Sequence, residues 1–170
     1  MIVEAIVVSD TNIFLDLFSV DLLTEFFELP YAIHTSDFVL GEILQPAQQK
    51  AIKPFVKSKK LTVVSFEFSE LSEISDLQNN CGTNLSVTDC SVWHHAKKMG
   101  ALLLTGDSKL RKAAEKDNVL VSGIIYVFDK LVENGILKMQ DAARKLSELV
   151  KQNPRLPHGE CQKRIANWTS

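Results

Sequence analysis

The chain has 170 residues, enough for one compact domain that needs neither a disulfide nor a metal to fold. Hydrophobic residues make up 45% of it, as in ordinary globular proteins. Nineteen Lys and Arg oppose 21 Asp and Glu, and the resulting net charge of −2 excludes a strongly basic nucleic-acid coat and an acidic disordered tail.

The three cysteines, Cys81, Cys90 and Cys161, are odd in number and have no CxxC spacing. This usage is typical of reduced thiols and predicts a cytoplasmic protein. The apolar run at the N-terminus is short and has no basic residues before it, so we expect a strand there and no signal peptide. No apolar stretch approaches the roughly 20 residues of a membrane span, so no membrane partner is expected.

Short apolar runs alternate with helical patterns along the chain. The predicted strands are residues 3–8, 31–34, 61–66, 101–104 and 119–121. The predicted helices are residues 11–18, 21–29, 37–44, 50–60, 69–78, 86–99, 108–116, 123–133 and 138–152. This alternation predicts an α/β fold of three layers, α/β/α, with a central and mainly parallel sheet.

One linker-like stretch, NPRLP at residues 153–157, follows the last predicted helix. We therefore predict a domain over residues 1–152 and a C-terminal extension over residues 153–170, which we read as a short tail without an assigned role.

Two predicted strands end directly in an aspartate, Asp10 and Asp107, and sites in open α/β sheets form at this end of the strands. Two further acids, Glu42 and Asp89, lie inside apolar helical patterns, where a carboxylate is costly unless it is paired or binds a cation. Four carboxylates at one sheet edge would suit one or two Mg²⁺ or Mn²⁺ ions, which prefer oxygen ligands.

Each acid also has a purely structural interpretation. Asp10 could cap the helix that begins at Thr11, and Asp107 could lie in a turn that leads to a helix cap. Ser86 and Asp89 have the S-x-x-D spacing of a capping box, and Glu42 could face solvent. Four such acids together, two of them at strand ends, favour a site.

The order of these blocks resembles the PIN domain, the nuclease fold of the VapC-like toxins of toxin–antitoxin pairs. SDTNIFLDL at residues 9–17 resembles the opening strand with its first acid, and VLGEIL at 39–44 resembles the helix that supplies the second. LSVTDCSVWHHAKKMGALLLTGD at 85–107 resembles the third block, in which a helix supplies one acid and a strand ends in T-G-D.

This resemblance implies a metal-dependent endoribonuclease that leaves 5′-phosphate and 3′-hydroxyl ends. Its catalytic and metal-binding residues would be Asp10, Glu42, Asp89 and Asp107, with Asn12 and Thr105 orienting the ligands or the phosphate. For toxin members the resemblance also implies a cognate antitoxin and a homodimer. The alternatives are a PIN-type nuclease in RNA processing or DNA cleavage, and a catalytically inactive PIN-like binding module.

Basic side chains on the predicted surface helices could follow the phosphates of an RNA substrate. The candidates are Lys53, Lys57, Lys97, Lys109 and Arg111. The plainer alternative is that such lysines are solvated and serve solubility.

Cys90 and His94 lie four residues apart on one predicted helix, at a spacing that can place two ligands on one metal. A zinc site would need two more ligands. We therefore expect a buried cysteine and an ordinary histidine instead.

Overall fold

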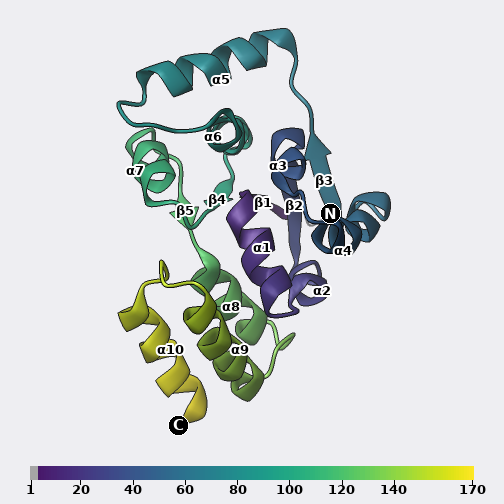
Figure 1. Ribbon diagram of the computed structural model, residues 1–170, viewed down its shortest axis with the longest axis vertical. Coiled ribbons are helices and arrows are strands. Elements are labelled where there is room, and N and C mark those ends of the chain that lie inside the picture. The colour runs from purple at the N-terminus through teal and green to yellow at the C-terminus, as the bar shows by residue number, and fades with distance from the viewer. Residues whose placement is uncertain (1–3) are drawn as a thin grey trace.

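Five parallel strands form the central sheet in the computed structural model, which describes residues 4–170 (Figure 1). The strands are β1 (Ala5–Ser9), β2 (Tyr31–Ser36), β3 (Leu61–Val64), β4 (Leu102–Leu104) and β5 (Val121–Ser122). The predicted α/β class is confirmed, and every strand pairing among the described residues is parallel. The predicted start of the first strand, at residue 3, lies outside the described residues.

The order of the strands places β1 at the centre of the sheet, as β3-β2-β1-β4-β5. Val8 in β1 lies opposite His34 of β2 on one side and Leu103 of β4 on the other. The chain therefore builds outward from β1 in one direction, then returns and builds in the other. Such a reversal opens a crevice at the carboxyl ends of the two strands that flank it, here β1 and β4.

Helices cover both faces of the sheet, which confirms the three predicted layers (Figure 1). They are α1 (Thr11–Ser19), α2 (Leu23–Phe26), α3 (Asp37–Glu42), α4 (Pro46–Lys57), α5 (Phe68–Asn80), α6 (Val87–Met99), α7 (Ser108–Lys116), α8 (Ile124–Glu133), α9 (Met139–Gln152) and α10 (His158–Thr169). On one face α6 packs across β1, β2 and β4, with α5 outside it, while α1 and α8 lie on the other side (Figure 1).

Phenylalanines between α1, α2 and α4 fill part of the core. Phe14 and Phe26 are fully buried and meet edge to face at 6.2 Å, and Phe27 stacks on Phe55 at 4.2 Å. Their helical spacing serves core packing, so they are not a surface for stacking bases.

Two predicted helices are longer than the ones that form. The helix predicted over residues 21–29 shrinks to α2, because Asp21 takes a left-handed conformation with φ of 55°. The helix predicted over residues 37–44 ends at Glu42, since Ile43 is extended, and this leaves Leu44 76% exposed. Both stretches are apolar enough to predict a helix, but in each one the backbone leaves the helical conformation within the apolar stretch.

Within the predicted C-terminal extension, residues His158–Thr169 form the helix α10. Arg164 of α10 pairs with Asp129 of α8 at 3.1 Å, and Trp168 stacks on Phe128 of α8 with ring centroids 6.4 Å apart. Cys161 of α10 is also fully buried. The C-terminal helix thus packs on the helices next to it.

Within residues 4–170, no helix combines the length and the hydropathy that crossing a bilayer would require.

Candidate functional site at the crevice between β1 and β4

Asp10 lies directly after β1, at the crevice, and is only 3% exposed. Its Oδ1 accepts a hydrogen bond from the Thr11 amide at 2.8 Å, which caps α1. Its Oδ2 accepts one from the Thr105 hydroxyl at 2.7 Å and a longer one from the Asn12 amide group at 3.4 Å. A buried carboxylate with hydrogen bonds but without a cationic partner among the described residues is uncommon in a protein interior.

The loop after β4 holds Thr105 and Asp107 against Asp10. The Thr105 hydroxyl, which donates to Asp10, also accepts a hydrogen bond from the Asp107 amide at 3.1 Å. Asn12 Oδ1 accepts from the Gly106 amide at 2.9 Å and so connects α1 to the same loop. The polar residues that follow β1 and β4 therefore lie next to each other, as expected for the carboxyl ends of neighbouring parallel strands.

Asp107 caps α7 with one of its two oxygens. Its Oδ1 accepts from the amides of Lys109 and Leu110 at 2.8 and 3.0 Å. Among the described residues no hydrogen bond reaches its Oδ2. The structural interpretation as a helix cap is therefore correct, and it leaves one oxygen available to another ligand.

Asp89 occupies the first turn of α6 and forms a capping box with Ser86. Asp89 Oδ2 accepts from the Ser86 amide at 3.0 Å, and the Asp89 amide donates to Ser86 Oγ at 3.0 Å. Nothing in the described part of the chain hydrogen-bonds to Asp89 Oδ1. The half-buried Asp89, like Asp107, combines a capping role with a free oxygen.

Glu42 ends α3 and is exposed, as its structural interpretation held. Its Oε2 nevertheless accepts a hydrogen bond from the Thr11 hydroxyl at 2.7 Å. Because Thr11 follows Asp10 directly, this contact brings the end of α3 to the same crevice.

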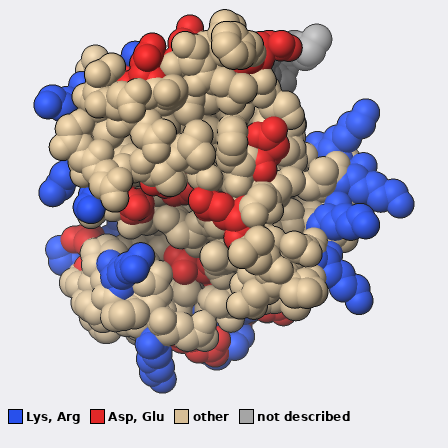
Figure 2. All heavy atoms as spheres, turned by 45° about the horizontal axis from the view of Figure 1, so that its top comes forward, with Lys and Arg blue, Asp and Glu red and all other residues tan. Residues whose placement is uncertain are grey.

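The pKa values of two of these carboxyl groups, Asp10 and Asp89, are raised in the folded protein. Burial raises the pKa of Asp10 to about 6 against the hydrogen bonds from Thr105 and Thr11, and the charges of Asp89 and Glu42 raise it further. Burial also raises the pKa of Asp89, as do the charges of Asp107 and Glu42. Figure 2 shows acidic side chains along a hollow that crosses one face, with Lys and Arg at both sides of it.

A divalent cation fits this donor set by its chemistry, because all four ligands are carboxylates and three of them, Glu42, Asp89 and Asp107, have an oxygen without a hydrogen bond among the described residues. Three of the acids also lie in or before the first turn of a helix, whose partial positive charge offsets some of their repulsion. The fit is incomplete in position, since within residues 4–170 no three such side chains stand close enough together to hold one ion. Binding would draw the carboxylates toward each other.

The basic candidates are spread around the hollow. Lys53 and Lys57 are exposed on α4, and Lys109 is exposed in the first turn of α7. Arg111 is half-buried on α7, and its Nη1 lies 3.4 Å from both Glu115 Oε1 and the Val121 carbonyl. The Lys97 ammonium instead pairs with Asp117 at 2.9 Å, which leaves it less available to a phosphate.

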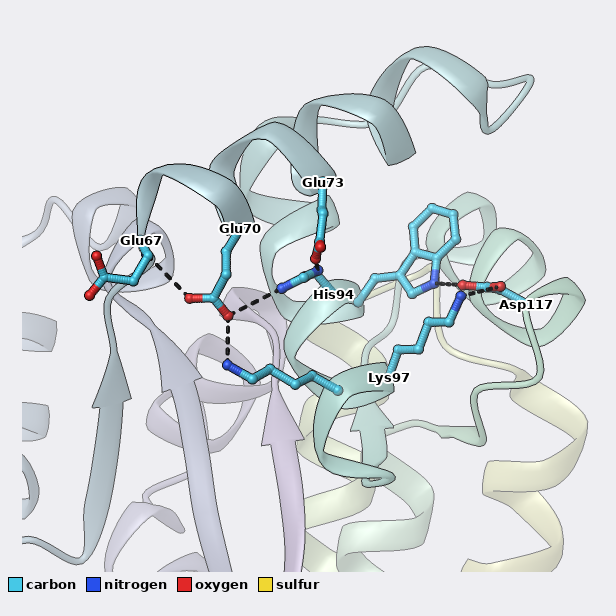
Figure 3. Close-up of polar contacts among 8 residues, drawn as sticks. Glu67, Glu70, Glu73, His94, Lys97 and Asp117 are labelled. Carbon is cyan, nitrogen blue, oxygen red and sulfur yellow. Dashed lines mark hydrogen bonds and ion pairs between the residues drawn. The ribbon is translucent and has the colours of Figure 1, made fainter.

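The histidine pattern on α6 serves packing between helices. His94 lies 3.4 Å from Glu70 and 3.6 Å from Glu73, both on α5, and Lys98 pairs with Glu70 at 2.7 Å (Figure 3). Lys98 and these hydrogen bonds lower the pKa of Glu70 to about 2. These contacts fasten α5 onto α6.

Burial raises the pKa of Cys90 to about 12, so its thiol stays protonated. Cys90 is fully buried, as expected, and His94 is buried beside α5.

Sequence reasoning gave little weight to Thr11 and missed two residues near the crevice, Asp16 and Arg155. The Thr11–Glu42 contact spans 31 residues, and Asp16 meets Asn153 over 137 residues. No local pattern signals such contacts, although an aspartate inside the apolar face of α1 was a sign that Asp16 has a partner.

The whole chain was compared with known protein families and structures. A family model for the PIN domain matches residues 6–170. The chain belongs to the PIN domain family. This match includes the last 18 residues, which the sequence interpretation had set apart. Among curated proteins, none is similar enough to this chain to count as a match.

Solved structures of PIN proteins resemble the chain more distantly. VapBC2 from Rickettsia felis, bound to a DNA fragment from its promoter, is 16% identical with a TM-score of 0.47, over 69% of this chain and 98% of that one. FitAB bound to the IR36 DNA fragment is 14% identical with a TM-score of 0.45, over 69% and 94%. FitAcB from Neisseria gonorrhoeae is 14% identical with a TM-score of 0.41, over 68% and 95%.

Proposed function

We propose that this PIN protein is a divalent-metal-dependent endoribonuclease, which hydrolyses phosphodiester bonds of RNA. The observation that carries the proposal is the meeting of Asp10, Glu42, Asp89 and Asp107 from four different elements at the crevice between β1 and β4. Three of these acids cap helices, but capping alone does not require that the capped helix ends lie near one another, where the repulsion between the acids costs stability.

The ions would be Mg²⁺ or Mn²⁺, one or two of them, held by Asp10, Asp89, Asp107 and Glu42. When bound, such an ion neutralises the scissile phosphate and lowers the pKa of a water molecule that attacks it. Asp89 and Asp107 each offer the oxygen that their helix caps leave free.

The neighbouring polar residues orient these acids. The Thr105 hydroxyl donates to Asp10 and accepts from the Asp107 amide, so one side chain fixes the relative position of two ligands. Asn12 connects Asp10 to the Gly106 amide, and Thr11 holds Glu42. Groups in such positions commonly contribute ten- to a hundredfold to metal affinity or activity.

The biological setting is the second half of the proposal. Because the chain is a PIN protein whose motifs resemble those of VapC-like toxins, we propose that it is the toxin of a toxin–antitoxin pair. It would then bind an antitoxin protein and form a homodimer in the cytoplasm.

The activity is tested by Asp10→Asn, which removes one charge and keeps the shape of the side chain. Purified wild type is expected to cleave single-stranded RNA only with Mg²⁺ or Mn²⁺, whereas Asp10→Asn loses cleavage by at least a hundredfold. Asp76→Asn is the matched control, because Asp76 is exposed on α5, away from the crevice. Equal cleavage by wild type and Asp10→Asn would refute the assignment.

The toxin role needs a separate experiment. Regulated expression in a bacterium should arrest growth with the wild type and not with Asp10→Asn. If both are harmless while the purified wild type still cleaves RNA, the protein is a PIN nuclease of RNA processing. Cleavage of DNA in preference to RNA would identify the remaining nuclease alternative, and no cleavage of either would identify a binding module.

A further inference from the structure

A cleft of about 550 Å³ opens beside the acidic site, and the C-terminal segment forms part of its wall. Thr105 and Asp107 line it where it meets the crevice, and Asn153, Arg155 and Leu156 line it at the far end. These last residues belong to the loop between α9 and α10, which lies below α7 and β5 in Figure 1.

The C-terminal wall of the cleft is held in place. The Asn153 side chain donates to Asp16 Oδ1 of α1 at 3.2 Å and accepts from the Arg155 amide at 3.1 Å. Leu156 is only 8% exposed, and α10, which follows it, is tied to α8 by Arg164 and Trp168. A wall with these anchors can position a ligand without first becoming ordered.

Two guanidinium groups reach the cleft from different walls. Arg111 comes from α7, and its hydrogen bonds to Glu115 and Val121 are both long, at 3.4 Å. Arg155 comes from the opposite, C-terminal wall, and its side chain has no ion pair or hydrogen bond within residues 4–170. Arginine forks bind phosphate through paired hydrogen bonds, and neither fork is fully used inside the protein.

The remaining lining of the cleft combines apolar side chains with the polar side chains of Asn12, Asp16 and Ser108. Ile13 of α1 and Ile124 and Ile125 of α8 line it between the two arginines, together with Leu156. The volume lies within the roughly 300–1,000 Å³ of ligand pockets. Apolar walls with a few charged groups at the rim suit a flat base that carries a phosphate.

We propose that this cleft binds one nucleotide of the RNA strand next to the scissile bond, with Arg155 and Arg111 holding its phosphate. The C-terminal segment, residues 153–157, is then part of the substrate site. This inference rests on the proposed function, because the acidic crevice supplies the scissile position from which the strand continues.

A nucleotide is favoured over a protein segment because the cleft shares residues with the acidic site. Thr105 and Asp107 belong to both. A phosphodiester held at the acids must continue into a neighbouring space, and this cleft is continuous with that position. A partner protein would need no such continuity.

The test measures RNA binding by Arg155→Gln in the cleavage-deficient Asp10→Asn protein. Binding of a labelled single-stranded RNA with Mg²⁺ present is followed by fluorescence anisotropy over a series of salt concentrations. We expect the dissociation constant to rise about tenfold, as for a lost hydrogen bond to a charged group. The slope of log affinity against log salt should fall by about 0.7, as for one lost phosphate contact on a single strand.

Arg144→Gln is the matched control, since Arg144 is exposed on α9 and pairs with Asp141, outside the cleft. Arg155→Lys keeps the charge and should recover part of the affinity. A chemical-shift titration with uridine 5′-monophosphate gives a second measurement, in which shifts at Gly123 and Leu156 should be weaker in Arg155→Gln.

The outcomes separate the two proposals. If Arg155→Gln and Arg144→Gln bind RNA equally well with the same salt slope, the cleft proposal is wrong, whatever the activity. If the wild type cleaves RNA and Arg155→Gln with an intact Asp10 has an unchanged KM, the nuclease proposal stands and only the cleft proposal fails. A loss of antitoxin binding in Arg155→Gln without any change in RNA binding would assign the cleft to the partner instead. If the wild type neither binds nor cleaves RNA, both proposals fail.

Discussion

At the scale of single residues, the position of Asp10 lowers the stability of the folded protein. It is 3% exposed, and it is surrounded by hydrogen-bond donors and by other acids instead of by cations. Residues held in such unfavourable surroundings are typical of functional sites, where selection keeps chemistry at the expense of stability. Thr105 takes part in the same arrangement, because its hydroxyl connects the Asp10 carboxylate to the backbone amide of Asp107.

The dependence of stability on pH should therefore reveal Asp10. Its pKa is about 6 in the folded protein and 3.8 ordinarily, so the folded state binds the proton more tightly. The stabilisation this provides is complete below pH 3.8 and is lost as the pH rises through 6. The side chain of Asp10→Asn never ionises. At pH 7 the free energy of unfolding of this variant should therefore exceed that of wild type by about 1–3 kcal/mol.

Urea unfolding at pH 7 and near pH 4, in the presence of a chelator, measures this difference. The advantage of Asp10→Asn should vanish near pH 4, and Asp16, whose pKa is also raised to about 6 by burial, titrates equally in both proteins. Adding Mg²⁺ at pH 7 should stabilise only the wild type, because binding to the folded state alone raises its stability. The idea is refuted if Asp10→Asn is less stable than wild type at pH 7 without metal.

At the scale of elements, α10 decides whether residues 153–170 are an appendage or part of the domain. Trp168 is 9% exposed and stacks on Phe128, so Trp168→Ala should lower the free energy of unfolding by about 3 kcal/mol. For a chain of this length that corresponds to a fall in Tm of roughly 6–12 °C.

Lys163→Ala on the same helix is the control, because Lys163 is exposed and makes only a surface pair with Glu160. It should change stability by less than about 0.5 kcal/mol. A single unfolding transition in both variants would show that α10 unfolds with the domain. If Trp168→Ala were as stable as the wild type, the packing of α10 would not contribute to the stability of the domain.

The elements also show what a sequence can reveal here. Asp10 and Asp107 were predictable because strand ends and helix caps have local signals, and parallel strands bring their carboxyl ends to one edge. The role of residues 153–170 had no local signal, because α10 has few apolar residues; Cys161 and Trp168 are nevertheless buried, and Trp168 stacks on Phe128 of α8. The far wall of the cleft was equally invisible, since Asp16 and Asn153 meet across 137 residues.

At the scale of the whole molecule, a net charge of −2 is the sum of two separated regions. Acidic side chains lie along the hollow, and basic ones stand at its sides (Figure 2). Lys53 and Lys57 are exposed on α4, and Lys109 is exposed on α7. Bound cations would reverse the field in the hollow, and the flanking lysines could then meet phosphates that continue past it.

This distribution predicts how RNA affinity responds to salt. The triple variant Lys53→Gln, Lys57→Gln and Lys109→Gln, in the Asp10→Asn background with Mg²⁺ present, should reduce the slope of log affinity against log salt by about 2. Each phosphate contact on a single strand contributes about 0.7 to that slope. A matched triple variant, Lys116→Gln, Lys138→Gln and Lys163→Gln, removes the same charge from exposed positions on α7, α10 and the turn before α9.

If affinity followed net charge alone, the two triple variants would have the same slope, because both change the chain by three charges. Different slopes require that the phosphates lie along particular lysines. Fluorescence anisotropy over a salt series distinguishes these cases, and equal slopes would mean that Lys53, Lys57 and Lys109 only keep the protein in solution.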